Sequence, residues 1–361
     1  MKKIISLYLT VIMLFLICAG CNHNKEPMHE ESLKEAPTQE ASVQEEPSQE
    51  APSQGEPTQE TPPQEEPPLV STYVLPDNTV YFTADISPEG LMRVYQALEA
   101  EPEGSIAVKL STGEPPKSNY LKPELIKDFV QSLDGTIVEC NTAYGGRRTN
   151  TEYHLQVAKD HGFTDIADVD IMDSEGEISL PVIGGDILKE NFVGSHFTNY
   201  DYFVVLSHFK GHEMAGYGGA IKNISIGIAS STGKSWIHSG GKLKKGIGGN
   251  QDAFLKSMAE AGKAVAESLN GKILYINVMN RLSIDCDCNG YPAEPDMHDV
   301  GILASFDPVA LDQACIDFVA NDPDGESLMR RIDAKNGLLT LEHAAKIGLG
   351  VREYTMVNID D

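Results

Sequence analysis

Residues 202–206 read YFVVL, a run of apolar side chains that predicts a strand buried on both faces of a sheet. Four more segments have the same short apolar character, at residues 105–110, 136–140, 272–278 and 301–304. Between them lie segments with helical spacing of apolar residues or helix-start signals, at residues 123–133, 151–161, 253–269 and 308–320. Strands that alternate with helices predict an α/β fold, a mainly parallel sheet with helices on both faces. The length leaves open two subdomains around a cleft.

Ligands of such sheets bind in the loops that follow the carboxyl ends of strands. We therefore expect a site in the loops after Leu206, Val278 and Ala304. Asp299 and Asp307 flank the last of these strands and are candidate ligands or bases. Asp307 is also explained as the N-terminal cap of the following helix.

The loop after Leu206 combines histidines and lysines with eight glycines in residues 207–241. Glycine at this density lets the backbone approach a ligand closely and exposes amide donors to anions. Apolar residues within the same loop indicate an ordered, partly buried segment. We predict a functional cluster that contains His208, His212, Lys222 and His238.

A second dense loop follows Val278. It places two thiols and two carboxylates within four residues, Asp285, Cys286, Asp287 and Cys288. Thiolates with imidazole suit zinc or another borderline-soft divalent metal, and we favour a metal site. Its candidate ligands are His208, His212, His238, Asp285, Cys286, Cys288 and Asp299.

Disulfides are the alternative to a metal. Cys140, Cys286, Cys288 and Cys315 allow three pairings outside a reducing compartment. We expect a bridge between Cys286 and Cys288 themselves to be strained. The two dense loops follow strands that can be neighbours, so they are predicted to form the two walls of one cleft.

Residues 1–20 predict an export signal, with Lys2 and Lys3 before an apolar core that is short for a membrane span. Ala19 and Gly20 then precede Cys21, a pattern that resembles the bacterial lipobox. The resemblance implies diacylation of Cys21, for example with palmitate, and a lipoprotein on the extracytoplasmic side of the cell membrane. An ordinary cleaved signal peptide is the alternative.

Residues 21–70 predict a disordered stalk behind the lipidated cysteine. Residues 22–68 hold nine prolines and twelve glutamates and no aromatic residue, so they cannot bury enough apolar surface to fold. We expect the globular domain to span residues 71–361. The net charge of −26 argues against nucleic acid as a partner and against electrostatic binding to anionic lipids.

Three separated motifs resemble the bacterial family known as domain of unknown function 362. They are HFKGH-x-x-x-GYGGAIKN at residues 208–223, CDC at residues 286–288 and FDPVALDQA at residues 306–314. Many members carry inserted cysteine-rich iron–sulfur motifs. In this chain Gly241 is followed directly by KLKKGIGGNQDAF, residues 242–254, which contain no cysteine, so we expect no iron–sulfur cluster.

The segment from His212 to His238 also resembles the active segment of the nickel-pincer lactate racemases. That resemblance implies a lysine bonded to the cofactor at Lys222 and histidines at the other two positions, with Lys222 and His212 as catalytic residues. Gly218, Gly219, Lys222 and Asn223 are the candidate cofactor-binding residues, and zinc or nickel is the candidate ion.

No P-loop, dinucleotide fingerprint or nucleophile elbow is present in the sequence. Our first hypothesis is a metal-binding, enzyme-like domain tethered outside the membrane. The rival is a solute-binding or cell-surface interaction lipoprotein that uses the same cleft without chemistry. Either hypothesis leaves an unknown small molecule as the ligand.

Overall fold

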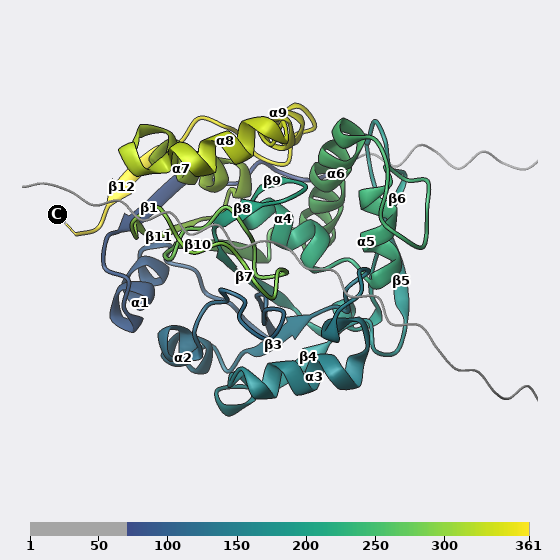
Figure 1. Cartoon of the computed structure of the whole chain (residues 1–361), viewed down its shortest axis with the longest axis horizontal. Helices are drawn as coiled ribbons and strands as arrows, with labels where there is room; N and C mark the ends of the chain where they lie inside the picture. Colours follow the sequence, from purple (N-terminus) through teal and green to yellow (C-terminus); the bar gives the residue numbers. More distant parts are fainter. Residues whose placement is uncertain (1–70, 361) are drawn as a thin grey trace, which may run out of the picture. The chain divides into compact units, whose positions relative to one another are not determined.

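The computed structural model describes residues 71–360, so the predicted leader, Cys21 and stalk lie outside the described residues. Its main sheet has eight strands in the order β12-β1-β11-β10-β7-β2-β3-β4 (Figure 1). The strands are β1 (Thr79–Thr83), β2 (Ile106–Lys109), β3 (Thr136–Glu139), β4 (Val169–Ile171), β7 (Tyr202–His208), β10 (Ile273–Met279), β11 (Gly301–Ser305) and β12 (Thr355–Asn358). The five strands predicted from apolar runs are all present.

Parallel pairs dominate the sheet. β2 pairs in parallel with β3 and β7, β3 with β4, β7 with β10, and β1 with β12, whereas β11 is antiparallel to both of its neighbours. The fold is therefore α/β with a mainly parallel sheet, as predicted.

Helices cover both faces of this sheet. On one side lie α1 (Pro88–Ala97), α2 (Pro123–Ser132) and α3 (Thr151–Asp160) (Figure 1). On the other lie α4 (Ala220–Lys222), α5 (Ser231–His238), α6 (Gln251–Leu269), α7 (Pro308–Asn321), α8 (Glu326–Ala334) and α9 (Leu338–Lys346). Residues of β7 alternate between the two cores, because Phe203 and Val205 face one and Val204 and Leu206 face the other.

Smaller elements complete the fold. Two hairpins pair β5 (Glu177–Pro181) with β6 (Glu190–Gly194) and β8 (Lys210–His212) with β9 (Gly216–Gly218). A π-helical turn, Asn223–Gly227, continues α4, and short 3-10 turns lie at Arg147–Thr149, Phe163–Asp165, Ser195–Asn199 and Pro323–Gly325. Residues 71–360 belong to one compact unit. Within them, no helix has the length and apolar character needed to cross a membrane.

The direction of β11 corrects one prediction. The carboxyl ends of β7 and β10 are side by side, with His208 opposite Val278. Because β11 runs antiparallel to β10, Gly301 rather than Ser305 lies at that edge of the sheet. The loop after Ala304 therefore emerges at the opposite edge, where Asp307 caps α7 by accepting the N–H groups of Val309 and Ala310.

Candidate ligand-binding site

A cavity of about 700 Å³ lies at the carboxyl ends of the parallel strands. Lys109 ends β2, Glu139 ends β3 and His208 ends β7, and all three line it. The loop after β10 supplies the facing wall, including Asp287 and Cys288. The two dense loops therefore meet around one cavity, as the sequence predicted.

The glycine-rich segment is ordered, because a buried carboxylate holds its turn. Asp312 on α7 accepts the backbone N–H groups of Ala220 at 2.7 Å and Ile221 at 3.0 Å, and the side-chain amide of Asn277 at 2.8 Å. A Cβ atom on Gly219 would lie 2.3 Å from the same carboxylate, so only glycine fits there. Burial raises the pKa of Asp312 to about 6.

Sequence reasoning missed Asp312. The available signal was the FDPVALDQA motif, in which Asp307 is the N-terminal cap of α7 and Asp312 lies five residues later within the helix. Asn223, predicted to bind a cofactor, lines the cavity. Its side-chain amide donates to the carbonyl oxygens of Lys109 and Leu206 and to the hydroxyl of Ser207.

Lys222 ends α4 and lines the cavity. Its amine makes no hydrogen bond or ion pair with any other residue in the range 71–360. Burial, together with the positive charge of Lys210, lowers the pKa of Lys222 to about 7. The amine is therefore divided between its charged and neutral forms near neutral pH.

The deep carboxylates of the cavity already have cationic partners. Arg148 pairs with Glu114 at 3.2 Å and with Glu139 at 3.3 Å, and Lys210 pairs with Asp287. Two other carboxylates line the cavity: Glu213, which is exposed, and Asp285, which pairs with Arg331 outside it.

Two more lysines add positive charge without a carboxylate partner among the described residues. Lys109 donates to the carbonyl oxygen of Leu110, and burial lowers its pKa to about 8. Lys234 donates to the carbonyl oxygens of Cys140 and Ala229. With Lys222, three lysines of the cavity lining have no carboxylate partner among the described residues, although the chain as a whole carries −26.

Hydrogen bonds fix the tautomers of two cavity histidines. Nδ1 of His212 accepts the N–H groups of Ala215 at 2.9 Å and Met214 at 3.2 Å, so the proton of the neutral ring is on Nε2. Nδ1 of His238 lies 2.6 Å from the carbonyl oxygen of Lys234 and donates to it, which leaves the lone pair on Nε2.

Both rings are neutral at physiological pH. Burial and the neighbouring Lys222 hold the pKa of His212 well below its usual value, and burial lowers the pKa of His238 to about 4. His212 therefore offers the cavity a donor, and His238 offers an acceptor.

Two predicted metal ligands lie in positions that do not suit a metal. His208 has both nitrogens engaged, Nδ1 with Asp287 at 3.2 Å and Nε2 with the carbonyl oxygen of Asn280 at 2.6 Å. Asp299 is exposed, accepts the N–H of Arg281 at 2.6 Å and is not part of the cavity wall.

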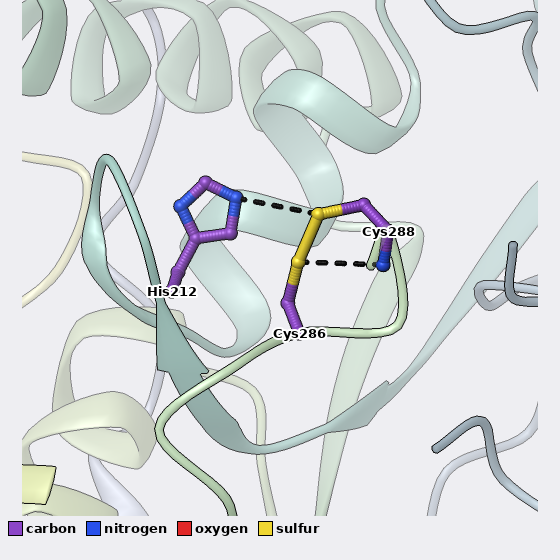
Figure 2. A group of neighbouring side chains, drawn as sticks. All are labelled: His212, Cys286 and Cys288. Atoms are coloured by element: carbon purple, nitrogen blue, oxygen red, sulfur yellow. Dashed lines mark hydrogen bonds between the residues drawn. A yellow bond between two sulfur atoms is a disulfide. The ribbon is translucent and has the colours of Figure 1, made fainter. Parts of the chain in front are cut away.

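Cys286 and Cys288 form a disulfide on the cavity wall, beside His212 (Figure 2). We expected a bridge between these two residues to be strained, and their Cα atoms lie 5.3 Å apart. Cys140 and Cys315 are free and buried.

Ligand-type atoms of His212, Cys286 and Cys288 lie within 4.8 Å of one another. Among the described residues the one other such group is His298 with Asp322 and Asp324, which is remote from the cavity lining. The sulfurs of the first group are bonded to each other, and Nε2 of His212 carries a proton. As the side chains lie, this group therefore offers no thiolate and no imidazole lone pair to an ion.

Comparison with known proteins gives a family and two distant structural neighbours. No curated protein matches the chain. The lactate racemase apoprotein from Thermoanaerobacterium thermosaccharolyticum is 15% identical with a TM-score of 0.42, over 68% of this chain and 59% of that one. A crystal structure of a protein from Thermotoga maritima is 13% identical with a TM-score of 0.39, over 76% of this chain and 61% of that one. This chain therefore covers only about three fifths of either neighbour's length.

The family model described as "Domain of unknown function (DUF362)" matches residues 106–317. That range contains the cavity-lining ends of β2, β3 and β7, the glycine-rich turn with Lys222 and the loop with the two bonded cysteines. It also contains Asp312, which holds the turn. The chain belongs to the domain of unknown function 362 family.

Proposed function

We propose that the protein is a lipid-anchored lipoprotein on the extracytoplasmic side of the membrane, whose α/β domain binds a small organic anion in the cavity around Lys222. One observation carries the ligand class: the amine of Lys222 has no partner within the described residues, in a cavity whose deep carboxylates are already paired. A half-buried cation without a counterion is poorly solvated, so an anionic group beside it is stabilised.

A carboxylate is the anionic group that we favour. His212 and His238 present one donor and one acceptor to the same cavity, which suits a second polar group on the ligand such as a carbonyl or hydroxyl. Lys222 in its neutral form is a nucleophile, so the same site can act on a carbonyl carbon. A solute-binding role uses the same contacts without that step.

The test is a binding panel of acetate, pyruvate, malonate and inorganic phosphate, read by titration calorimetry and thermal shift. We expect the carboxylates with a second polar group to bind best and Lys222→Met to lose at least about tenfold in affinity while it stays folded. Lys245→Met, which removes an exposed lysine outside the cavity, is the matched control. Equal affinity of parent and Lys222→Met would exclude this function.

Binding of a divalent metal, zinc or nickel, is a second candidate, favoured by the clustering of His212, Cys286 and Cys288. It requires reduction of the disulfide and transfer of the His212 proton from Nε2. Metal analysis of protein purified without chelators, with a parallel count of free thiols, separates the two candidates. One equivalent of metal with free thiols supports the metal site, and bonded cysteines without metal argue against it.

A further inference from the structure

The disulfide between Cys286 and Cys288 is poorly suited to stabilising the fold. It joins residues two positions apart, so it closes a very short loop. The stabilisation from a cross-link grows with the length of the loop it closes, because longer loops lose more freedom in the unfolded chain. A bond that contributes so little to stability, and that lines a ligand cavity, suits a chemical role better than a structural one.

Each sulfur has a hydrogen-bond donor beside it. Nε2 of His212 lies 3.8 Å from Sγ of Cys288, and the tautomer derived above puts a proton on that nitrogen (Figure 2). The backbone N–H of Cys288 donates to Sγ of Cys286 at 3.3 Å. Donors and positive charge stabilise a thiolate more than they stabilise a disulfide sulfur. Lys222 supplies positive charge in the same cavity, whereas Lys210 is paired with Asp287.

The two cysteine residues differ in exposure. Cys286 is 6% exposed, whereas Cys288 is half-buried. An incoming thiol would therefore reach Cys288, and Cys286 would be the leaving group. The other two cysteines of the domain, Cys140 and Cys315, are enclosed in the core.

We propose that Cys286 and Cys288 are a redox-active pair that exchanges electrons with a dithiol admitted to the cavity. This inference goes beyond the anion site and does not depend on it.

The exchange proceeds in two steps. A thiolate of the dithiol attacks Sγ of Cys288, the Cys286–Cys288 bond breaks, and the Cys286 thiolate leaves beside the N–H of Cys288. The second thiol of the reductant then attacks its own sulfur in the mixed disulfide and releases the Cys288 thiolate beside His212. The dithiol becomes a disulfide, and the protein pair gains two electrons and two protons. The reverse reaction reoxidises the pair.

The first experiment equilibrates the folded protein with dithiothreitol at graded ratios of reduced to oxidised reagent, followed by alkylation and mass spectrometry. We expect Cys286 and Cys288 to gain and lose label together and reversibly. Cys140 and Cys315 should stay unlabelled until the protein is denatured. A bond that survives excess reduced reagent in the folded protein, yet opens in urea, would overturn the proposal. So would thiols that remain free in excess oxidised reagent.

The second experiment tests His212 as a positioning residue. In Cys286→Ser the Cys288 thiol is free, and the pH dependence of its alkylation rate reports its pKa. Adding His212→Phe should raise that pKa by about one unit, a tenfold slower reaction at fixed pH. Adding His212→Gln, which keeps a donor, should restore most of the rate, and His298→Phe is the control on an exposed histidine. If folded His212→Phe shows an unchanged pH profile of Cys288 alkylation, His212 does not stabilise the Cys288 thiolate. If that variant does not fold, the dithiothreitol titration of the first experiment is the test of the proposal.

Discussion

Lys222 differs from an ordinary surface lysine because of what surrounds its amine. Surface lysines keep their charged end in water, whereas the half-buried Lys222 faces the cavity near Lys210 without a carboxylate partner among the described residues. The sequence predicted that Lys222 and the histidines gather at one place, because histidines, lysines and glycines were dense in one loop. It could not predict which lysine lacks a partner, since the pairing of Lys210 with Asp287 joins residues 77 positions apart.

The pH dependence of binding follows from the protonation of Lys222. The charged form binds an anion and the neutral form does not, so affinity should be highest below the pKa of about 7 and fall as the pH rises through it. Lys109, with a pKa of about 8, should extend the decrease in anion affinity to higher pH. Calorimetric titration with pyruvate or malonate between about pH 6 and pH 9 measures this pH dependence of the affinity. Lys222→Arg, which stays charged over this range, should flatten the profile, and an equally steep profile in that variant would assign the effect to another group.

At the scale of elements, apolar runs were enough to predict the central strands but not the edge of the sheet. β1 has only buried and half-buried positions and β12 has no buried position, so neither shows a clear alternation, and both were missed, as were α8 and α9 at the end of the chain. The direction of β11 could not be predicted from the sequence either, because a short buried strand has the same composition whichever way it runs in the sheet. Asp312 was missed because its partners, Ala220 and Ile221, are backbone groups of a distant turn.

The turn held by Asp312 allows a test on stability. Its pKa is raised from 3.8 to about 6, so ionisation costs the folded state about 3 kcal/mol. A raised carboxyl pKa contributes stability that is present below about pH 4 and lost as the pH rises through 6. Asp312→Asn removes this cost but also loses one acceptor for a buried N–H, worth about 1–3 kcal/mol. We therefore expect little net change in the free energy of unfolding at neutral pH, with weaker anion binding because the Lys222 turn is loosened.

Urea unfolding of both proteins at about pH 4 and pH 7 measures the effect. The stability of the variant relative to the parent should rise by about 2.5 kcal/mol between these two pH values. A constant difference would show that Asp312 does not ionise in this range. If Asp312→Asn binds the anion as tightly as the parent, the conformation of the Lys222 turn does not depend on Asp312.

At the scale of the whole molecule, the described residues form one unit, and the predicted anchor lies outside them. The lipid anchor therefore rests on the sequence pattern around Cys21. The proposed location and the redox proposal agree in one respect, because disulfides persist most readily outside a reducing compartment.

Replacing the anchor residue tests the tether directly. In Cys21→Ser, acylation is impossible, and we expect the protein to move from the membrane fraction to the soluble extracytoplasmic fraction. Fractionation followed by immunoblotting measures this, with Cys140→Ser as a control that removes a cysteine of the folded domain. A Cys21→Ser protein that remains with the membranes would exclude lipid anchoring at this residue.

The reversal of β11 has a consequence for how the site can be varied. Antiparallel neighbours need only a tight turn of two residues between them, yet residues 280–300 connect β10 to β11. The sheet therefore imposes almost no length requirement on this connection, in contrast to the crossovers between its parallel strands. A library of grafted loops between Met279 and Gly301 that keeps Asp287, the partner of Lys210, would explore new chemistry on a constant scaffold.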